Sequence, residues 1–232
     1  QALLVACKKC YASLFTDRAI SYRQIHGFDH MQVALSVGVQ QMVRADTGGA
    51  GVMFSIDTES GFPDAVLINA AWGLGENVVQ GAVDPDEFQV FKPFLETPGL
   101  SPVLEKRLGE KAVKMILDRD GSTRNVPTST AERAQFVLSD DEILTLARYA
   151  KVIEDHYGQP MDMEWARDGV TGKIYIVQAR PETVQSRLSP GALKSYTVKD
   201  PGPAIVTGLS VGSAAVAGRV CMIESAADID RF

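Results

Sequence analysis

Within residues 161–180, Asp162, Glu164, Gln178 and Arg180 place two carboxylates, an amide and a guanidinium at the spacing of paired β-strands. Side chains of a strand point alternately to opposite faces, so Asp162 and Glu164 share one face of the first predicted strand. Gln178 and Arg180 share a face of the second by the same rule. If the register of the hairpin brings these two faces together, the four polar groups form one patch.

That patch has the chemistry needed to hold Mg-ATP. Mg²⁺ prefers oxygen ligands and is usually held by one or two carboxylates together with substrate phosphates. Glu164 could bind the metal with support from Asp162, and the side-chain oxygen of Gln178 could add a neutral ligand. Arg180 stays charged and offers a planar fork of donors that fits a phosphate. Phosphoryl transfer depends mainly on such placement and charge neutralisation. The alternative is a solvated strand face with a cross-strand salt bridge, which spacing alone does not exclude.

The elements that position this patch are a predicted β-hairpin, with strands at 160–166 and 173–179 and a turn at 168–172. Strict alternation assigns the remaining side chains of the hairpin to faces. In the first strand the residues opposite the acids are Met161, Met163 and Trp165. In the second, Ile174 and Ile176 fall on the face of Gln178 and Arg180, and the opposite face holds Tyr175, Val177 and Ala179.

The other segments predict an α+β fold with a mostly antiparallel sheet and flanking helices. Helices are expected at 2–15, at about 17–23 after a cap at Thr16 or Asp17, and at 139–157, where Ser139 is the N-cap and Gly158 the stop. A second hairpin is expected from strands 33–43 and 51–56 around a turn at 46–49. Further strands are expected at 65–71 and 87–91, and as short pieces between 93 and 127.

Composition excludes several classes of function. The net charge is −6 without a dense basic run, which disfavours a nucleic-acid binder or a polybasic membrane anchor. No apolar run approaches the ~20 residues of a membrane helix. The three cysteines indicate no disulfide framework and favour a reducing, cytoplasmic setting, with Cys7 and Cys10 read as small apolar residues on one helix face. The sequence has no P-loop motif, no complete dinucleotide fingerprint and no serine or cysteine nucleophile pattern.

Several sequence blocks resemble the family of phosphoenolpyruvate synthase. They are PMDMEWARDGVTGKIYIVQARPETV around 160–184, ASLFTDRAISYR at 12–23, VALSVGVQQMV at 33–43, GVMFSIDTESG at 51–61 and AAWGLGENVVQGAVDPDEF at 70–88. Pyruvate, phosphate dikinase and the rifampicin phosphotransferases are related to this family. The resemblance covers most of residues 12–185 and implies an ATP-grasp nucleotide-binding domain.

The resemblance implies a role for each matching residue. The metal-binding glutamate of the family matches Glu164, and the acid two positions before it matches Asp162. The phosphate-side glutamine and arginine match Gln178 and Arg180, with Gln178 also a metal ligand and Arg180 the catalytic group. The strand that meets adenine through its backbone matches Gln40, Gln41, Met42 and Val43. Glu76 is implied to lie near the same cleft.

The resemblance also implies a domain division. Residues 1–185 match the C-terminal part of the ATP-grasp domain, 186–203 a linker, and 204–232, with GLSVGSAAVAGRV at 208–220, the first strands of a swivelling phosphohistidine domain. None of His26, His30 and His156 stands in the Thr-Cys-His context of the phosphocarrier histidine. The pyruvate-binding barrel and a lysine-bearing first subdomain are expected outside this chain. We therefore expect the piece itself to be inactive.

The implied enzyme is a pyruvate, water dikinase of gluconeogenesis. It converts pyruvate, ATP and water into phosphoenolpyruvate, AMP and phosphate through a phosphohistidine, with Mg²⁺ as cofactor, and is compatible with a homo-oligomer. One alternative is a related dikinase or an antibiotic phosphotransferase of the same architecture. Another is a non-catalytic nucleotide-binding module, and activity of the full-length gene product with pyruvate would separate the two.

Overall fold

The computed structural model describes residues 1–182, 202–203, 206 and 217–222. The predicted linker at 186–203 and the predicted start of a further domain at 204–232 lie mostly outside these residues. The described part divides into two units, which are Gln1–Met42 and the part that begins at Val43. Within the described part, no helix has the length and apolar character needed to cross a membrane.

The first unit consists of two helices with a short 3₁₀ turn between them. Helix α1 spans Ala2–Ala12, η1 spans Ser13–Phe15 and α2 spans Asp17–His26, so both predicted helices are confirmed. Thr16 stands at the N-cap of α2 but its side chain makes no capping hydrogen bond. Buried Arg23 holds this unit together by donating to His30 Nδ1 at 2.9 Å and to the carbonyl oxygen of Leu14 at 2.5 Å.

The predicted strand at 33–43 is wrong. No strand is assigned to these residues, all of which the structure describes, and Ala45–Thr47 forms the 3₁₀ helix η2 where a hairpin turn was expected. The reason lies in the next strand, β1 at Gly49–Phe54, which pairs with β2 on one side and β7 on the other. Because both edges of β1 are occupied, it has no edge left for residues 33–43 to pair with.

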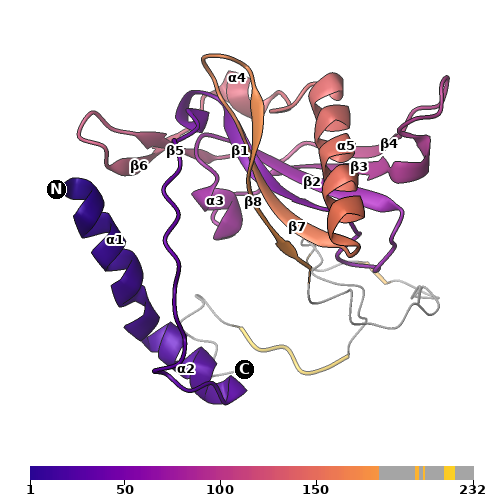
Figure 1. Ribbon diagram of the computed structural model, residues 1–232. Helices are drawn as coiled ribbons and strands as arrows, with labels where there is room; N and C mark the ends of the chain where they lie inside the picture. Colours follow the sequence, from indigo (N-terminus) through magenta and orange to yellow (C-terminus); the bar gives the residue numbers. More distant parts are fainter. Residues whose placement is uncertain (183–201, 204–205, 207–216, 223–232) are drawn as a thin grey trace. The chain divides into compact units, whose positions relative to one another are not determined.

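The second unit is built on a six-stranded sheet in the order β4-β3-β2-β1-β7-β8 (Figure 1). All of its pairs are antiparallel. The strands are β2 at Ala65–Trp72, β3 at Asp86–Phe91, β4 at Val103–Arg107, β7 at Met161–Arg167 and β8 at Ile174–Pro181, in addition to β1. Strands β5 at Val113–Leu117 and β6 at Thr123–Pro127 form a separate two-stranded sheet. The expectation of a mostly antiparallel α+β fold is confirmed.

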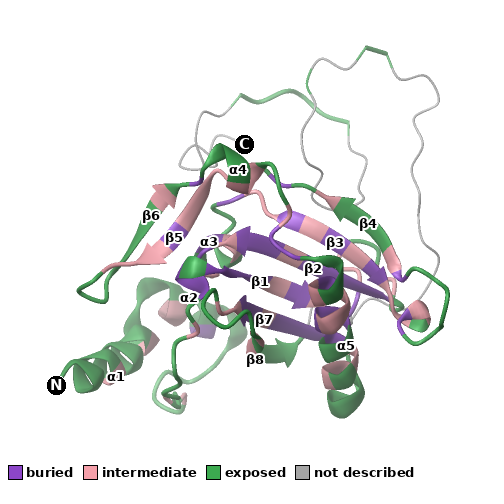
Figure 2. Ribbon diagram, turned by 90° about the horizontal axis from the view of Figure 1, so that it is seen from above, coloured by how far each residue is buried: buried purple, intermediate pink, exposed green. Residues whose placement is uncertain are grey.

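Helix α5, Asp140–Tyr157, covers one face of the main sheet (Figures 1 and 2). Its predicted cap is confirmed, since Ser139 and Glu142 form a capping box and Gly158 ends the helix with φ 66°. Apolar residues of α5 pack against the covered face of the strands and are fully buried. The helix contributes Ile143, Leu146, Ala147 and Ala150 to this core, and the sheet contributes Met53, Ile68, Phe88 and Met163.

Short elements complete this unit. Helix α3 spans Glu76–Val79, η3 spans Lys92–Phe94 and α4 spans Thr130–Arg133. Asp86 at the start of β3 accepts hydrogen bonds from the backbone N–H groups of Gly109 and Val137 and from Lys111 Nζ. Because Asp86 and Lys111 are both fully buried, this pair ties the 109–111 loop and the segment before α5 to the sheet.

Candidate nucleotide site

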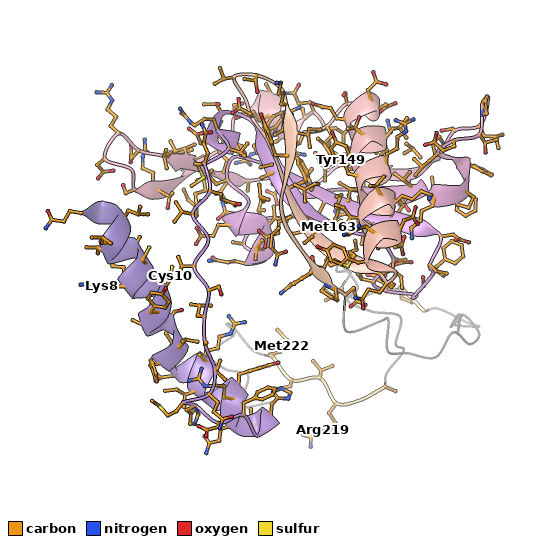
Figure 3. All side chains as sticks on the ribbon, viewed as in Figure 1. Lys8, Cys10, Tyr149, Met163, Arg219 and Met222 are labelled. Atoms are coloured by element: carbon orange, nitrogen blue, oxygen red, sulfur yellow. The ribbon has the colours of Figure 1, made fainter. Side chains whose placement is uncertain are left out.

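The β7–β8 register brings the predicted polar residues together on one face. Asp162 lies directly opposite Arg180, and Glu164 lies directly opposite Gln178. Residues directly opposite each other in an antiparallel pair point to the same side, so all four side chains share the face away from α5. Met163, which lies between the two acids in sequence and is labelled in Figure 3, is fully buried on the helix-covered face. The sequence-based juxtaposition is therefore observed.

The predicted faces of Ile174 and Ile176, and of Tyr175 and Val177, are wrong because β8 carries a β-bulge. Glu164 pairs with Gln178, but the next residue of β7, Trp165, pairs with Ile176. Val177 is thus an additional residue that shifts the alternation of β8 by one. Ile174 and Ile176 consequently pack on the helix-covered core, while Gln178 and Arg180 lie on the other face.

The four polar side chains differ in their partners. Arg180 places Nε at 2.8 Å and Nη2 at 2.7 Å from Asp162 Oδ2. Over the described ranges, the side chains of Glu164 and Gln178 have no hydrogen-bond or ion-pair partner, although Glu164 is half-buried. A half-buried carboxylate beside a free amide oxygen can accept a cation, and that chemistry suits a magnesium ligand pair.

The protein supplies few further metal ligands. Among the described residues, no group of three or more histidine, cysteine, aspartate or glutamate side chains could hold a metal ion. A magnesium ion held partly by phosphate oxygens needs only one or two protein carboxylates. Glu164 and Gln178 fit that arrangement, with Asp162 engaged by Arg180.

A small apolar cluster lies on the same face, farther along β1 and β7. Ala45, Ala50 and Ala166 are buried in it, and the half-buried side chains of Val43, Leu74 and Val177 pack against them. Sequence reasoning identified only Val43 of this group. The signal that could have found two of the others is a small residue on each strand, Ala166 two positions after Glu164 on β7 and its partner Ala50 on β1.

The turn between β7 and β8 contacts the first residues of the second unit and holds them in place. The backbone N–H of Gly169 donates to the carbonyl oxygen of Arg44 at 3.1 Å. A Cβ at Gly48 would lie 2.3 Å from the carbonyl oxygen of Arg167, so only glycine allows this approach. Backbone N–H donation, first from Thr171, lowers the pKa of Asp168 against the opposing effect of burial. These contacts hold Val43 and Ala45 beside β7.

The other residues predicted for the site do not belong to the polar group on β7 and β8. Gln40, Gln41 and Met42 are exposed and end the first unit, whereas Val43 begins the second. Glu76 is the first residue of α3, and its carboxylate accepts a hydrogen bond from Gln80 Nε2 at 2.9 Å. The structure brings together Asp162, Glu164, Gln178 and Arg180, with Val43 in the adjoining apolar cluster.

A pocket of about 670 Å³ lies over β2, β3 and β4. Its strand residues include Asn69, Glu87 and Arg107, which are direct partners across β2, β3 and β4. Asp84 and Glu87 both engage the guanidinium of Arg107. Because Glu59 and Glu105 also line it, the pocket is acidic and does not suit a phosphate.

Comparison with known proteins identifies one matching family model, described as the pyruvate phosphate dikinase AMP/ATP-binding domain, over residues 1–198. The chain is 57% identical to phosphoenolpyruvate synthase of Synechocystis sp. over 99% of its own length. It is 54% identical to the phosphoenolpyruvate synthase of Pseudomonas aeruginosa over 97% and 48% identical to that of Escherichia coli over 100%. In each case it spans 29% of the relative's length.

Proposed function

Because this chain belongs to the pyruvate phosphate dikinase AMP/ATP-binding domain family, we propose that its β7–β8 face binds Mg-ATP for phosphoryl transfer. The single observation that carries the proposal is the register that sets Glu164 opposite Gln178 and Asp162 opposite Arg180. This register places an acid, an amide and a guanidinium on one face. The carboxylate of Glu164 is available to a cation.

Each polar side chain has a distinct role in this proposal. Glu164 and Gln178 hold Mg²⁺ through their oxygens, and Asp162 supports the metal side while it orients Arg180. The metal ion, when bound, neutralises phosphate charge. Arg180 places its remaining N–H donors toward the phosphates, where it stabilises the charge that develops during transfer. Gln40, Gln41, Met42 and Val43 meet the adenine through their backbone.

We also propose the activity of the longer protein. The relatives are named phosphoenolpyruvate synthase, and the proposed reaction converts pyruvate, ATP and water into phosphoenolpyruvate, AMP and phosphate through a phosphohistidine. Residues 1–185 are proposed to be the C-terminal part of an ATP-grasp nucleotide-binding domain. Residues 204–232 are proposed to begin the swivelling phosphohistidine domain, and the cytoplasm is the proposed site of action.

The decisive experiment replaces Glu164 by alanine in the full-length protein that carries this chain. We expect Glu164→Ala to abolish transfer of label from [³²P]ATP to the carrier histidine, with circular dichroism and melting temperature unchanged. The matched control is Glu105→Ala, which removes an exposed glutamate from β4 of the same sheet and leaves labelling intact. Unchanged labelling in Glu164→Ala removes this residue from the mechanism.

A further inference from the structure

Arg44 stands where the chain enters the second unit, and its backbone forms a tight turn. The backbone N–H of Ala45 donates to the carbonyl oxygen of Val43 at 2.8 Å, and Arg44 between them has φ −76° and ψ 54°. A hydrogen bond across one residue with these angles is an inverse γ-turn. Because such a turn redirects the chain within three residues, the conformation of Arg44 determines how the backbone of Val43 is placed.

The side chain of Arg44 closes this turn through an ion pair. Its Nε lies 2.8 Å from Asp46 Oδ1 and its Nη2 lies 2.9 Å from Asp46 Oδ2, so each nitrogen meets a different oxygen. The side chain of Asp46 is 6% exposed and that of Arg44 is 49% exposed. The hydrogen bond from Arg44 lowers the pKa of Asp46 against the opposing effect of burial, so this carboxylate is charged at neutral pH. A largely buried carboxylate thus holds the arginine in one conformation.

The backbone of Arg44 is held as well as its side chain. Its N–H donates to Asp168 Oδ2 at 3.4 Å, and its carbonyl oxygen accepts from the backbone N–H of Gly169 at 3.1 Å. The hydroxyl of Thr47 donates to the same carbonyl oxygen at 3.2 Å. A Cβ at Gly169 would lie 2.2 Å from the carbonyl carbon of Thr47, so η2 and the β7–β8 turn meet through their backbones. Arg44 therefore joins the γ-turn to both of these segments.

Val43 is the residue that this arrangement places. Its carbonyl oxygen is bonded to Ala45, and its side chain packs on the small apolar cluster with Ala50 and Ala166. Within the described residues, the backbone N–H of half-buried Val43 has no hydrogen-bond partner. A backbone donor that is partly shielded from water loses free energy unless a partner pairs with it. The turn thus keeps one free backbone donor beside the face that carries the four polar side chains.

We propose that Arg44 is a positioning residue of the nucleotide site: its ion pair with Asp46 fixes the γ-turn, and the turn sets the backbone of Val43 for the ligand. This inference rests on the proposed function, in which the backbone of Val43 meets the nucleotide. Arg44 acts through the turn and makes no contact of its own with the ligand. Without the ion pair, the turn has to be ordered when the nucleotide binds, and that cost lowers the affinity.

The experiment measures ligand affinity of the full-length protein by calorimetry for wild type, Asp46→Asn, Arg44→Ala and the double variant. The probes are AMP without metal and inorganic tripolyphosphate with Mg²⁺. Asp46→Asn keeps the shape of the side chain but removes the charge that holds Arg44, so we expect affinity for AMP to fall about three- to tenfold. Tripolyphosphate should bind as tightly as to wild type, because the β7–β8 register that sets the polar pairs does not involve this turn.

The double variant separates positioning from direct contact. It should bind AMP no more weakly than Arg44→Ala alone, because both substitutions break one and the same interaction. The matched control is Asp118→Asn, which breaks the exposed pair of Asp118 with Arg124 at 2.7 Å on the β5–β6 hairpin. It should leave the affinity for both probes unchanged.

The outcomes separate the two proposals. If wild type binds neither probe, the proposed nucleotide site itself fails and the inference falls with it. If wild type binds both probes and Asp46→Asn lowers only the melting temperature, the pair serves the fold alone, and the inference is refuted while the nucleotide site stands. Weaker tripolyphosphate binding in Arg44→Ala, or tighter AMP binding in Asp46→Asn, also refutes it, because either result means that Arg44 contacts phosphate directly. Asp46→Asn keeps the inference testable even where Arg44→Ala does not fold.

Discussion

Arg180 lies directly opposite Asp162 on the β7–β8 pair and points two of its nitrogens at one carboxylate oxygen, with Nε at 2.8 Å and Nη2 at 2.7 Å. The side chain of Asp162 is 12% exposed and that of Arg180 is 66% exposed. A guanidinium has five N–H donors, so this contact leaves several directed elsewhere. The largely buried carboxylate of Asp162 therefore anchors and orients the Arg180 guanidinium, while most of the arginine side chain faces solvent.

The first prediction removes this anchor. Asp162→Asn should weaken binding of Mg-ATP about three- to tenfold, because Arg180 loses the charge that orders it before a phosphate arrives. The free energy of unfolding should fall by no more than about 1 kcal/mol, since an ion pair with one well-exposed partner contributes little. Calorimetry and urea denaturation of the full-length protein measure the two effects.

The control for that prediction is Asp155→Asn on α5, which breaks the exposed Lys151–Asp155 pair. It should leave nucleotide affinity unchanged. Equal ATP affinity in Asp162→Asn and wild type would show that Arg180 needs no anchor, or that it does not meet the nucleotide.

Local patterns in the sequence were sufficient to predict the hairpin and the long helix. Alternation placed Asp162 and Glu164 on one strand face, and the Ser139 cap with the Gly158 stop bounded α5 within a residue. These features depend on neighbours a few residues away, whose geometry is fixed by strand and helix periods. The same local rules could therefore find the polar face before any coordinates.

Features that depend on distant partners could not be predicted in this way. The apolar run at 33–43 has strand-like composition, but β1 already pairs on both edges, with β2 and β7. The shift at Val177 depends on how β8 meets β7, and nothing in the alternation of β8 alone marks it. The alternation of apolar and polar residues predicts which face of the sheet a side chain occupies, but the pairing register with the neighbouring strand determines the face that is observed.

The second prediction concerns pH and the N-terminus of α5. Burial acts to raise the pKa of Glu142, but hydrogen bonds from the Ser139 backbone N–H and from Arg167 outweigh it and lower that pKa below its ordinary value. A carboxyl group whose folded-state pKa is depressed stabilises the fold above its unfolded pKa. That stabilisation is lost as the pH falls through the folded-state pKa. Glu142→Gln should therefore cost about 1–2 kcal/mol at pH 7 and progressively less toward pH 3.

Urea denaturation of wild type and Glu142→Gln across that pH range measures the difference in unfolding free energy. Arg167 Nη1 lies 2.9 Å and 3.0 Å from the two Glu142 oxygens, so the glutamine loses the charge of this contact but keeps its shape. A difference that stays constant between pH 7 and pH 3 would mean that the charge of Glu142 does not stabilise the fold.

The third prediction concerns the buried pair of Lys111 and Asp86. Both side chains are 0% exposed, and Asp86 also accepts from the backbone N–H of Gly109 at 2.9 Å and of Val137 at 2.8 Å. Lys111→Met leaves a buried carboxylate without its counter-charge, which should destabilise the protein by about 3–5 kcal/mol. Lys106→Met breaks an exposed pair with Asp140 and should cost less than about 1 kcal/mol. Similar losses in the two variants, measured by urea denaturation, would contradict the buried-pair argument.

The last prediction tests whether the close approach of β1 to β2 positions the proposed nucleotide-binding face of β7 and β8. A Cβ at Gly51 would lie 1.8 Å from the carbonyl oxygen of Asn69, so Gly51→Ala forces the two strands apart. Because Gly51 precedes Val52, the partner of Glu164, the displacement reaches Glu164, the proposed metal ligand. We expect a loss of at least about 2–3 kcal/mol in unfolding free energy together with weaker Mg-ATP binding. Gly75→Ala is the matched control, since its Cβ would meet Ala50 Cβ at 3.4 Å, and it should change stability by less than about 1 kcal/mol. If Gly51→Ala melts and binds Mg-ATP as Gly75→Ala does, the strands can separate without cost, and the close β1–β2 contact is not what positions Glu164.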